Sequence, residues 1–279
     1  MRNKAFTLIE LLVVIAIVGI LSSVIYTNIT GLRDRAKITA GIRFDSSTLH
    51  SIGDQLVGEW LFNEASTTGA LDTSGYGNNG VYSATTWPTY QATGGYNGKG
   101  AYSFNGLNSP YDYIGLGNVA LFDLTTITIS VWVKATEPST YAGSYTPIIA
   151  KYSSNAGYDL YIKNSNGLLS WTVRGTSGIN FDTTKGSSLF DNQWHHIAAT
   201  GNATEVNLYL DGAFLDKKTG TWTPTFATDQ LRIGTRSAGY NYFNGLIDDI
   251  RIYSSVLSSS GIQKLYTEGV SSHSNLANK

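Results

Sequence analysis

The chain has 279 residues, of which only 14% are charged, and its formal net charge is −1. This balance argues against nucleic acid as the main partner, because nucleic acids are bound by basic surfaces. The sequence contains no cysteine, which excludes disulfide bonds, metal thiolates and thiol catalysis. Its length is enough for one large domain with an accessory element, or for two modest domains.

The chain begins with a short polar head, which contains Arg2 and Lys4, and continues into an unbroken apolar run from Leu11 to Leu21. One carboxylate, Glu10, stands at the head of this run, and the run contains no basic residue to pair with it. An ionised carboxylate within hydrocarbon costs roughly 2.5–3.5 kcal/mol on insertion scales. Its presence there indicates that this carboxylate has a function.

Two simpler interpretations of this segment are a secretory signal peptide and a plain membrane anchor. A signal peptide also has a basic start and an apolar stretch of about 7–15 residues. It does not carry a carboxylate at the head of that stretch, and no A-x-A cleavage site follows in Ser22 to Tyr26. A membrane anchor needs about 20 apolar residues. The segment from Phe6 to Ile25 supplies them, apart from Glu10 and three hydroxyl side chains.

Residues Ala5 to Leu21 closely resemble, position by position, the N-terminal signature of type IV prepilins and pseudopilins. The resemblance implies that a prepilin peptidase cuts just before Phe6 and that the new amine is methylated. Glu10 then becomes the fifth residue of the mature chain and pairs with the Phe6 amine of a neighbouring subunit during assembly. The sequence departs from the family at Ala5, where Gly is usual, so we expect slower cleavage rather than its loss.

The apolar segment continues into an amphipathic one, which predicts a single long helix over residues 6–54 after a leader of residues 1–5. Apolar residues recur at helical spacings of three, four and seven, at Ile38, Ile42, Leu49, Ile52 and Leu56. The first half of this helix would span the membrane and form the filament core. A basic cluster at residues 33–37 is interpreted as an interfacial collar rather than a DNA-binding stripe.

From Gly58 the apolar period changes from 3.6 to 2, which predicts an antiparallel β-domain over residues 55–270. In one strand Ile127, Ile129, Val131 and Val133 alternate with more polar residues, as in a half-buried strand. A short helix is expected over Ser258–Tyr266, followed by a flexible tail over residues 271–279. The chain is therefore α+β but mainly β, and its body is a two-sheet jelly-roll sandwich. The predicted strands are Glu59–Phe62, Gly80–Ser83, Ala101–Phe104, Tyr113–Leu116, Ile127–Lys134, Pro147–Tyr152, Tyr158–Ile162, Leu168–Arg174, His195–Thr200, Glu205–Leu210, Leu231–Gly234 and Leu246–Tyr253.

Seven phrases in this region resemble, in order, the laminin-G-like, concanavalin A-like lectin/glucanase jelly roll. The first is Trp60-Leu61-Phe62-Asn63-Glu64 and the last is Gly245-Leu246-Ile247-Asp248-Asp249-Ile250-Arg251-Ile252-Tyr253. The resemblance covers about Val57 to Gly269.

Hydrolysis is not expected, because glucanases of this fold carry an E-x-D-x-E or E-x-D-x-x-E run. Retaining hydrolysis needs two carboxyl groups about 5–5.5 Å apart, which alternate strand positions provide. No glutamate after residue 54 has an acidic residue two positions away. Asp248 and Asp249 should point to opposite sheet faces, as neighbours in a strand do. His195 and His196 are interpreted as packing residues for the same reason, and no catalytic residue is expected.

The resemblance implies that one structural Ca²⁺ is held by an Asp of the last long strand and by backbone carbonyls. Ca²⁺ binds six to eight hard oxygens, which acidic side chains and loop carbonyls supply together. Asp248 matches the family position best, and Asp72, Asn79 and Glu64 are weaker candidates. For Asp72, the alternative is an Asx-turn that closes the following bend.

Aromatic residues in polar connections are candidates for glycan binding, because aromatic faces pack on the apolar faces of sugars. A sandwich with 18 tyrosines also exposes some of them by chance, so a purely structural coat remains the alternative. The candidates are Tyr141, Tyr145, Tyr240, Tyr242, Trp87 and Trp222.

Taken together, the sequence predicts a structural subunit of a helical, homo-oligomeric type IV pilus-like filament. It would enter the inner (cytoplasmic) membrane as a single-pass prepilin, meet the prepilin peptidase and assembly machinery, and become extracellular. A minor pseudopilin of a type II secretion or DNA-uptake machine would share the same N-terminus. A membrane-anchored lectin that never polymerises would share the sandwich.

Processing is expected to leave Phe6 as the first residue of the mature protein, with a methylated amine. The reason is the junction between Ala5 and Phe6, which places Glu10 five positions into the product. Intact-mass measurement of the protein from the cell surface checks this. A surface chain that starts at Met1, or beyond Ser23, would contradict the prepilin interpretation.

Overall fold

The computed structural model describes residues 55–63, 65, 69–82, 87–106, 112–117, 120–138, 144–153, 156–226, 229–237 and 240–274. The predicted leader and long helix, with Ala5, Phe6 and Glu10, lie outside these residues. No helix within the described ranges is both long and apolar enough to cross a membrane.

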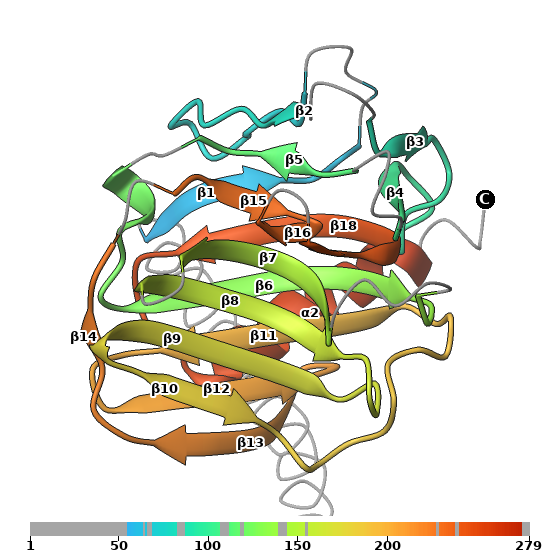
Figure 1. Ribbon diagram of the computed structural model, residues 1–279. Helices are drawn as coiled ribbons and strands as arrows, with labels where there is room; N and C mark the ends of the chain where they lie inside the picture. The colour runs from blue at the N-terminus through green and yellow to red at the C-terminus, as the bar shows by residue number, and fades with distance from the viewer. Residues whose placement is uncertain are drawn as a thin grey trace, which may run out of the picture. The chain divides into compact units, whose positions relative to one another are not determined.

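Two antiparallel sheets face each other (Figure 1). The first contains, in spatial order, β13 (Ala213–Thr219), β12 (Glu205–Leu210), β11 (His195–Gly201), β6 (Ile127–Ala135), β18 (Asn244–Tyr253), β4 (Ala101–Asn105) and β3 (Thr89–Gln91), and β1 (Leu56–Trp60) also pairs with β18. The second contains β10 (Ile179–Asp182), β9 (Leu169–Ser177), β8 (Ala156–Lys163), β7 (Tyr145–Ser153), β15 (Leu231–Ile233), β5 (Ile114–Gly115) and β2 (Val81–Tyr82), and β14 (Thr223–Pro224) pairs with β9. A hairpin of β16 (Thr235–Ser237) and β17 (Tyr240–Tyr242) contacts β7, and η1 (Ala120–Phe122) is a short 3-10 helix.

The predicted two-sheet sandwich is confirmed, and each predicted strand overlaps an observed one. The strands that the pattern missed are β3, β10, β13, β14, β16 and β17. Most of these are short, whereas β13 contains charged residues and is largely exposed at the edge of its sheet. Charged side chains are typical of edge strands, since they discourage pairing with other chains. They also hide the apolar alternation by which a strand is recognised.

The core lies between the sheets and is built from the inward-facing half of each alternating strand. Ile127, Ile129, Val131 and Val133 of β6 face this core, as their alternation predicts. The other side of β6 is also buried, so the expectation of a half-buried strand is wrong. The cover includes helix α2 (Ser259–Ser274), which lies behind the first sheet in Figure 1. One contact is the stacking of Tyr266 on Trp132, with ring centroids 5.8 Å apart.

Helix α2 begins where the sequence predicts and ends later. The Ser258 hydroxyl accepts a hydrogen bond from the Gly261 backbone N–H at 3.2 Å, which is the geometry of a helix N-cap. The helix continues to Ser274, so the first residues of the predicted flexible tail, 271–274, are helical. Packing of the helix on the first sheet explains the extension, because tertiary contacts supply most helical stability.

Candidate functional site

A bulge in β18 brings two buried carboxylates to the centre of the first sheet. The pairing of β18 with β6 shifts register between Asp248 and Arg251, and Asp249 has a positive φ of 43°. The strict alternation of a regular strand does not apply at a bulge. The Tyr96 hydroxyl donates a hydrogen bond to Asp249 Oδ2 at 3.1 Å. Burial raises the pKa of Tyr96, and the charges of Asp249 and Asp248 raise it further. The predicted opposite orientation of the two side chains therefore does not hold.

The two carboxylates differ in their partners. Asp249 Oδ1 lies 3.1 Å from the Arg251 Nε, which also lies 3.0 Å from Glu59 Oε1. Asp248 is fully buried, and its Oδ1 accepts a hydrogen bond from the Asp249 backbone N–H at 2.7 Å. Its Oδ2 has no hydrogen-bond partner in the described part of the chain. Burial and the neighbouring Asp249 raise the pKa of Asp248 to about 8. Arg251 opposes this rise, but no ion pair of Asp248 occurs among the described residues.

The surroundings of Asp248 fit a calcium ion. A β-carbon built on Gly95 would lie 2.5 Å from the Gly100 carbonyl oxygen, 2.6 Å from Asp248 Oδ2 and 3.0 Å from the Lys99 carbonyl oxygen. Asp248 Oδ2 and the two carbonyl oxygens therefore lie close to one another around Gly95, and hard oxygens of this kind are the ligands that Ca²⁺ prefers. No group of three or more acidic, histidine or cysteine side chains that could hold a metal occurs among the described residues. Backbone oxygens would therefore supply much of the coordination.

Asp72 and Asn79 belong to a separate network and do not join Asp248. The Asp72 carboxylate accepts backbone hydrogen bonds from Glu59 at 3.0 Å, Ser74 at 2.9 Å and Asn78 at 2.8 Å. Asn79 Oδ1 accepts from the Asp72 backbone N–H at 2.9 Å. Burial opposes the charge, but these hydrogen bonds lower the pKa of Asp72 overall. The Asx-turn is therefore the interpretation that the structure bears out. Glu64 lies outside the described residues.

A cavity of about 590 Å³ opens beside Asp248 on the outer face of the first sheet. Tyr96 and Trp132 are stacked in parallel, with centroids 4.1 Å apart, and Trp194 meets Tyr96 edge-on at 6.3 Å. Lys134 and Asp211 add charged groups to the lining. Wide aromatic surface with a few polar groups is typical of a small-ligand site. The full lining is Thr93, Gly94, Gly95, Tyr96, Trp132, Lys134, Trp194, Asp211, Leu246 and Tyr266.

Sequence reasoning missed this cavity, although one signal for it was present. Trp132 occupies the polar side of the alternation in β6, where an exposed tryptophan would be unusual. Tyr96 and Tyr266 come from the loop before β4 and from α2. No local pattern indicates that these segments meet over β6.

The predicted ligand aromatics have different environments. Trp87 is 58% exposed and stacks on Tyr82 at 5.6 Å, where both line a cavity of about 250 Å³. Trp222 is only 2% exposed, and its Nε1 donates to the Arg174 carbonyl at 2.8 Å. Tyr242 is equally buried. The expected surface display of Trp222 and Tyr242 is therefore wrong, because both rings lie in the interior.

The remaining predicted aromatics are divided between described and undescribed positions. Tyr145 packs edge-on against Tyr161 at 4.8 Å, on the outer face of the second sheet. Tyr141 and the side chain of Tyr240 lie outside the described residues.

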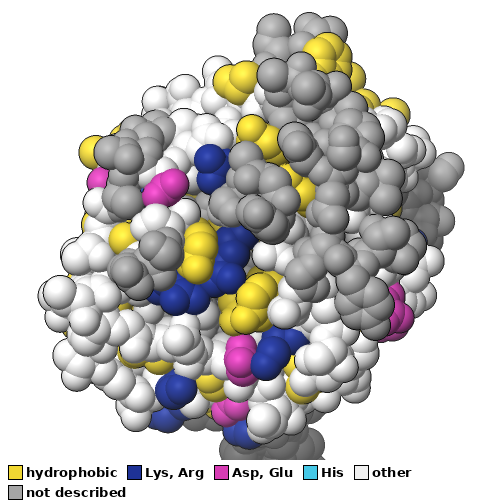
Figure 2. All heavy atoms as spheres, in the orientation of Figure 1, with side chains coloured by type: hydrophobic (Ala, Val, Ile, Leu, Met, Phe, Trp, Pro, Cys, Tyr) yellow, Lys and Arg dark blue, Asp and Glu magenta, His cyan; other side chains and the backbone are white. Residues whose placement is uncertain are grey.

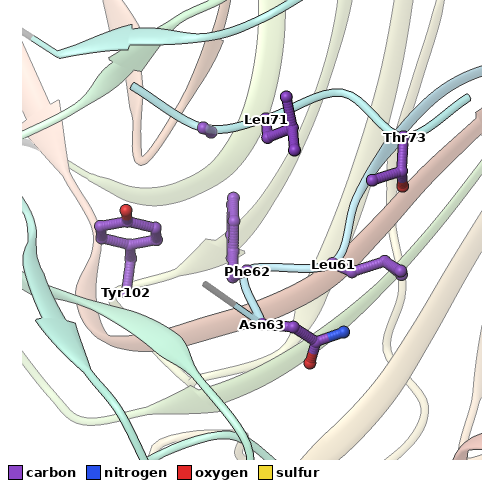
Figure 3. A pocket seen from close by; sticks show the side chains of 7 residues that line it. Leu61, Phe62, Asn63, Leu71, Thr73 and Tyr102 are labelled. Carbon is purple, nitrogen blue, oxygen red and sulfur yellow. The ribbon is translucent and has the colours of Figure 1, made fainter. Parts of the chain in front are cut away.

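A third cavity, of about 180 Å³, lies near Tyr102 and is mainly apolar (Figure 3). Leu61, Phe62, Asn63, Ala70, Leu71, Thr73 and Tyr102 line it. Like the cavity beside Trp87, it contains no carboxylate and no histidine.

The two adjacent histidines contact different partners, in agreement with a packing role. His195 Nδ1 lies 2.9 Å from Asp211 Oδ2 and its Nε2 lies 3.1 Å from Asp191 Oδ2. The Asp211 carboxylate, with help from Asp191, raises the pKa of His195 to about 9. His196 is buried, with Nε2 2.8 Å from the Ser130 hydroxyl, and burial lowers its pKa to about 3. The rings do not converge on a common ligand.

Comparison with known proteins agrees with both halves of the sequence. Residues 108–263, more than half of the chain, match the family model of the concanavalin A-like lectin/glucanases superfamily. Residues 1–26 match the prokaryotic N-terminal methylation motif. The chain therefore belongs to the concanavalin A-like lectin/glucanases superfamily and carries a prepilin-type N-terminus. The predicted fusion is confirmed.

This chain matches similar proteins over only part of their length. The zebrafish (Danio rerio) protein Adhesion G-protein coupled receptor V1 is 25% identical over 183 residues, which cover 61% of this chain and 3% of the receptor. The binding domain of Paraclostridial Mosquitocidal Protein 1 superposes with a TM-score of 0.62 at 17% identity, covering 77% of this chain and 52% of that one. The binding domain of botulinum neurotoxin DC, in complex with SialylT, superposes with a TM-score of 0.57 at 17% identity, covering 78% of this chain and 52% of that one. At these identities the structural likeness shows the fold alone.

Replacing Asp72 with alanine is expected to lower the thermal unfolding midpoint. The variant loses the acceptor of three backbone hydrogen bonds, and each buried donor left unpaired costs about 1–3 kcal/mol. Because the folded-state pKa of Asp72 is lowered, its contribution is present above the unfolded pKa and is lost as the pH falls. Thermal unfolding at neutral and acidic pH measures this. Asp229→Ala is the control, and equal midpoints for both variants would contradict the network's role.

Proposed function

We propose that the chain is a subunit of an extracellular type IV pilus-like filament that displays a glycan-binding sandwich. The observation that carries the proposal is the combination of the two matches in one chain. An N-terminal segment with the methylation motif would be processed in the inner membrane and would polymerise. A lectin-like domain on the same chain would then be exposed along the filament. The proposal includes no catalysis.

The aromatic cavity beside Asp248 is the proposed glycan site. Tyr96, Trp132 and Trp194 offer ring faces to the apolar side of a sugar, and Lys134 and Asp211 offer polar contacts to hydroxyl groups. The Asp211 carboxylate is already held by His195 and by the His196 backbone N–H at 2.9 Å. It is thus oriented for binding and has no second carboxylate beside it in the lining for hydrolysis.

Similar solved structures support a glycan ligand only by analogy. One similar structure is a binding domain of botulinum neurotoxin DC in complex with SialylT, and cell entry of botulinum neurotoxin type C is dependent upon interaction with two ganglioside molecules. This chain spans about half of each of those neurotoxin chains.

Calcium is proposed as a structural ion of this site. Asp248 with the carbonyls of Lys99 and Gly100 would hold it, and the ion would neutralise the buried carboxylate. Gly95 adjoins this point and also lines the cavity. The ion would therefore stabilise the loop that forms one wall of the glycan site.

Glu10→Ala should leave export and the sandwich intact but greatly reduce filament assembly. The Phe6 amine of the adjoining subunit would lose its partner in a low-dielectric environment, at a cost of several kcal/mol. Electron microscopy of the cell surface, with immunoblots of membrane and sheared fractions, measures assembly. Filaments at normal density in this variant would show that the carboxylate is not needed.

Trp194→Ala should weaken glycan binding about two- to ten-fold, since one aromatic contact contributes roughly 0.5–1.5 kcal/mol. Trp194 is half-buried at the cavity, so its loss should disturb the fold less than loss of Trp132. A glycan array probed with the full-length protein identifies the ligand, and titration of that ligand compares variants. Trp87→Ala, an exposed tryptophan at another cavity, is the matched control. If only the control loses binding, the site lies at Trp87 instead.

Calcium should raise the unfolding temperature of the wild type but not that of Asp248→Asn. When its free concentration is one hundred times Kd, a ligand stabilises the folded state by about 2.7 kcal/mol. The ion needs the ionised carboxylate, and the pKa of Asp248 is about 8. The calcium effect should therefore be larger at pH 9 than at pH 6. Melting curves with Ca²⁺ and with chelator test this, and identical wild-type curves would remove calcium from the proposal.

A further inference from the structure

The second sheet carries a cluster of arginine and tyrosine side chains on its outer face, away from the cavity on the first sheet. Its members, here called the Arg–Tyr cluster, are Tyr145, Tyr152, Asp159, Tyr161, Arg174 and Arg236. On β8, Tyr158, Leu160 and Ile162 belong to the core, so Asp159 and Tyr161 face outward. In Figure 2, basic side chains gather beside hydrophobic ones in the middle of the face shown.

Arg236 forms an ion pair and cation–π contacts within the cluster. Its Nε lies 2.8 Å from Asp159 Oδ2, and neither side chain is more than 10% exposed. Its Cζ lies 3.7 Å from the centroid of the Tyr152 ring and 5.1 Å from that of Tyr145. Arg236 lies on β16 and contacts side chains of β7 and β8, so it holds the β16–β17 hairpin against the sheet.

Arg174 shares the same aromatic ring but has no carboxylate of its own. Its Cζ lies 4.9 Å from the Tyr152 centroid, and its Nε has no hydrogen-bond partner in the described structure. Strand register explains the contact: Tyr152 pairs with Gly157, which pairs with Arg174. Since glycine has no side chain, the arginine reaches across β8 to the tyrosine. Arg174 is half-buried and so remains accessible.

The charges of this face do not balance. Asp159 pairs with Arg236, and Asp182 pairs with Lys163 at 2.8 Å, so each carboxylate has a cation. Arg174 is then a surplus positive charge. In addition, Asp159 is fully buried, yet its Oδ1 has no hydrogen-bond partner among the described residues. A donor and an acceptor that lack partners in one cluster indicate that something else completes them.

We propose that the Arg–Tyr cluster binds an acidic sugar, whose carboxylate pairs with Arg174 and whose ring packs on the tyrosines. The planar guanidinium matches a carboxylate in a two-point contact. Tyrosine faces suit the C–H face of a sugar ring. Because the one carboxylate of the cluster, Asp159, already pairs with Arg236, we expect the site to bind the sugar without cleaving it. It requires neither calcium nor the cavity on the first sheet.

The test uses the full-length protein in detergent micelles and two hexasaccharides. One alternates glucuronic acid with N-acetylglucosamine, and the other contains only N-acetylglucosamine. We expect the acidic sugar to bind at least about ten-fold more tightly and to weaken with rising salt. Arg174→Gln should abolish this preference, and Arg174→Lys, which keeps the charge without the fork, should be intermediate. Lys217→Gln, which removes an exposed cation on β13, should bind as the wild type does.

Equal binding of the two sugars, or an unchanged preference in Arg174→Gln, would overturn the proposal. Displacement of the acidic sugar by an equal concentration of inorganic sulfate would do so too, because the site would then recognise any anion. The unfolding midpoint of Arg174→Gln should match the wild type, since the lost Nε has no partner. If that variant is unstable, Arg174→Lys is used instead. A reduced preference for the acidic sugar in Arg174→Lys supports the proposal, and an unchanged preference overturns it. Trp194→Ala should not affect this binding, which separates the cluster from the proposed cavity site.

Discussion

The pairing of β18 with its three neighbours is the constraint on which the rest of the domain depends. β18 pairs with β6 on one side and with β4 and β1 on the other. This last strand therefore holds the first strand, β1, in the sheet. A regular strand in this place would direct its side chains alternately to the core and to the outer face. The bulge after Asp248 interrupts that alternation and leaves two carboxylates inside the sheet. The walls of the aromatic cavity form around this irregularity.

Buried carboxylates of this protein differ mainly in whether a cation pairs with them. Asp249 has Arg251, and Asp159 has Arg236. Asp72 has no cation, but three backbone N–H groups take its place. Of these four, only Asp248 has neither an ion pair nor three backbone donors in the described structure, and its Oδ2 lies near two backbone carbonyls. Removal of a charge from water is costly unless it is paired, so this difference separates structural carboxylates from a candidate ligand.

Local patterns predicted the inner half of the fold and much less of the outer half. The alternation of Ile127 to Val133 identifies β6 and its core face, because periodicity reports which side of a strand is apolar. It does not report what covers the other side, so the stacking of Tyr96 and Tyr266 on Trp132 was not foreseen. The Asx-turn at Asp72 could be anticipated, since its partners lie within a few residues. The bulge at Asp248 could not, because it depends on register with β6.

Loop composition was a weak guide to the direction of aromatic rings. Trp87 and Trp222 both lie next to proline in polar sequence, yet one is exposed and the other fills the interior. The difference arises from the backbone carbonyl of Arg174, which offers the Trp222 indole a partner inside the domain. Buried indoles usually need such a partner, and its position is a property of the fold.

The buried carboxylate of Asp248 also has a consequence for export of the domain. Burial of Asp248 disfavours its ionised form, and a cation bound at its Oδ2 would stabilise the folded domain. Cytoplasm is poor in free calcium and the exterior is rich in it. If the site takes calcium, the chain would be easiest to keep unfolded on the side where it is synthesised and must cross a membrane. Calcium would then stabilise the domain after export, so that one carboxylate would couple stability to the direction of transport.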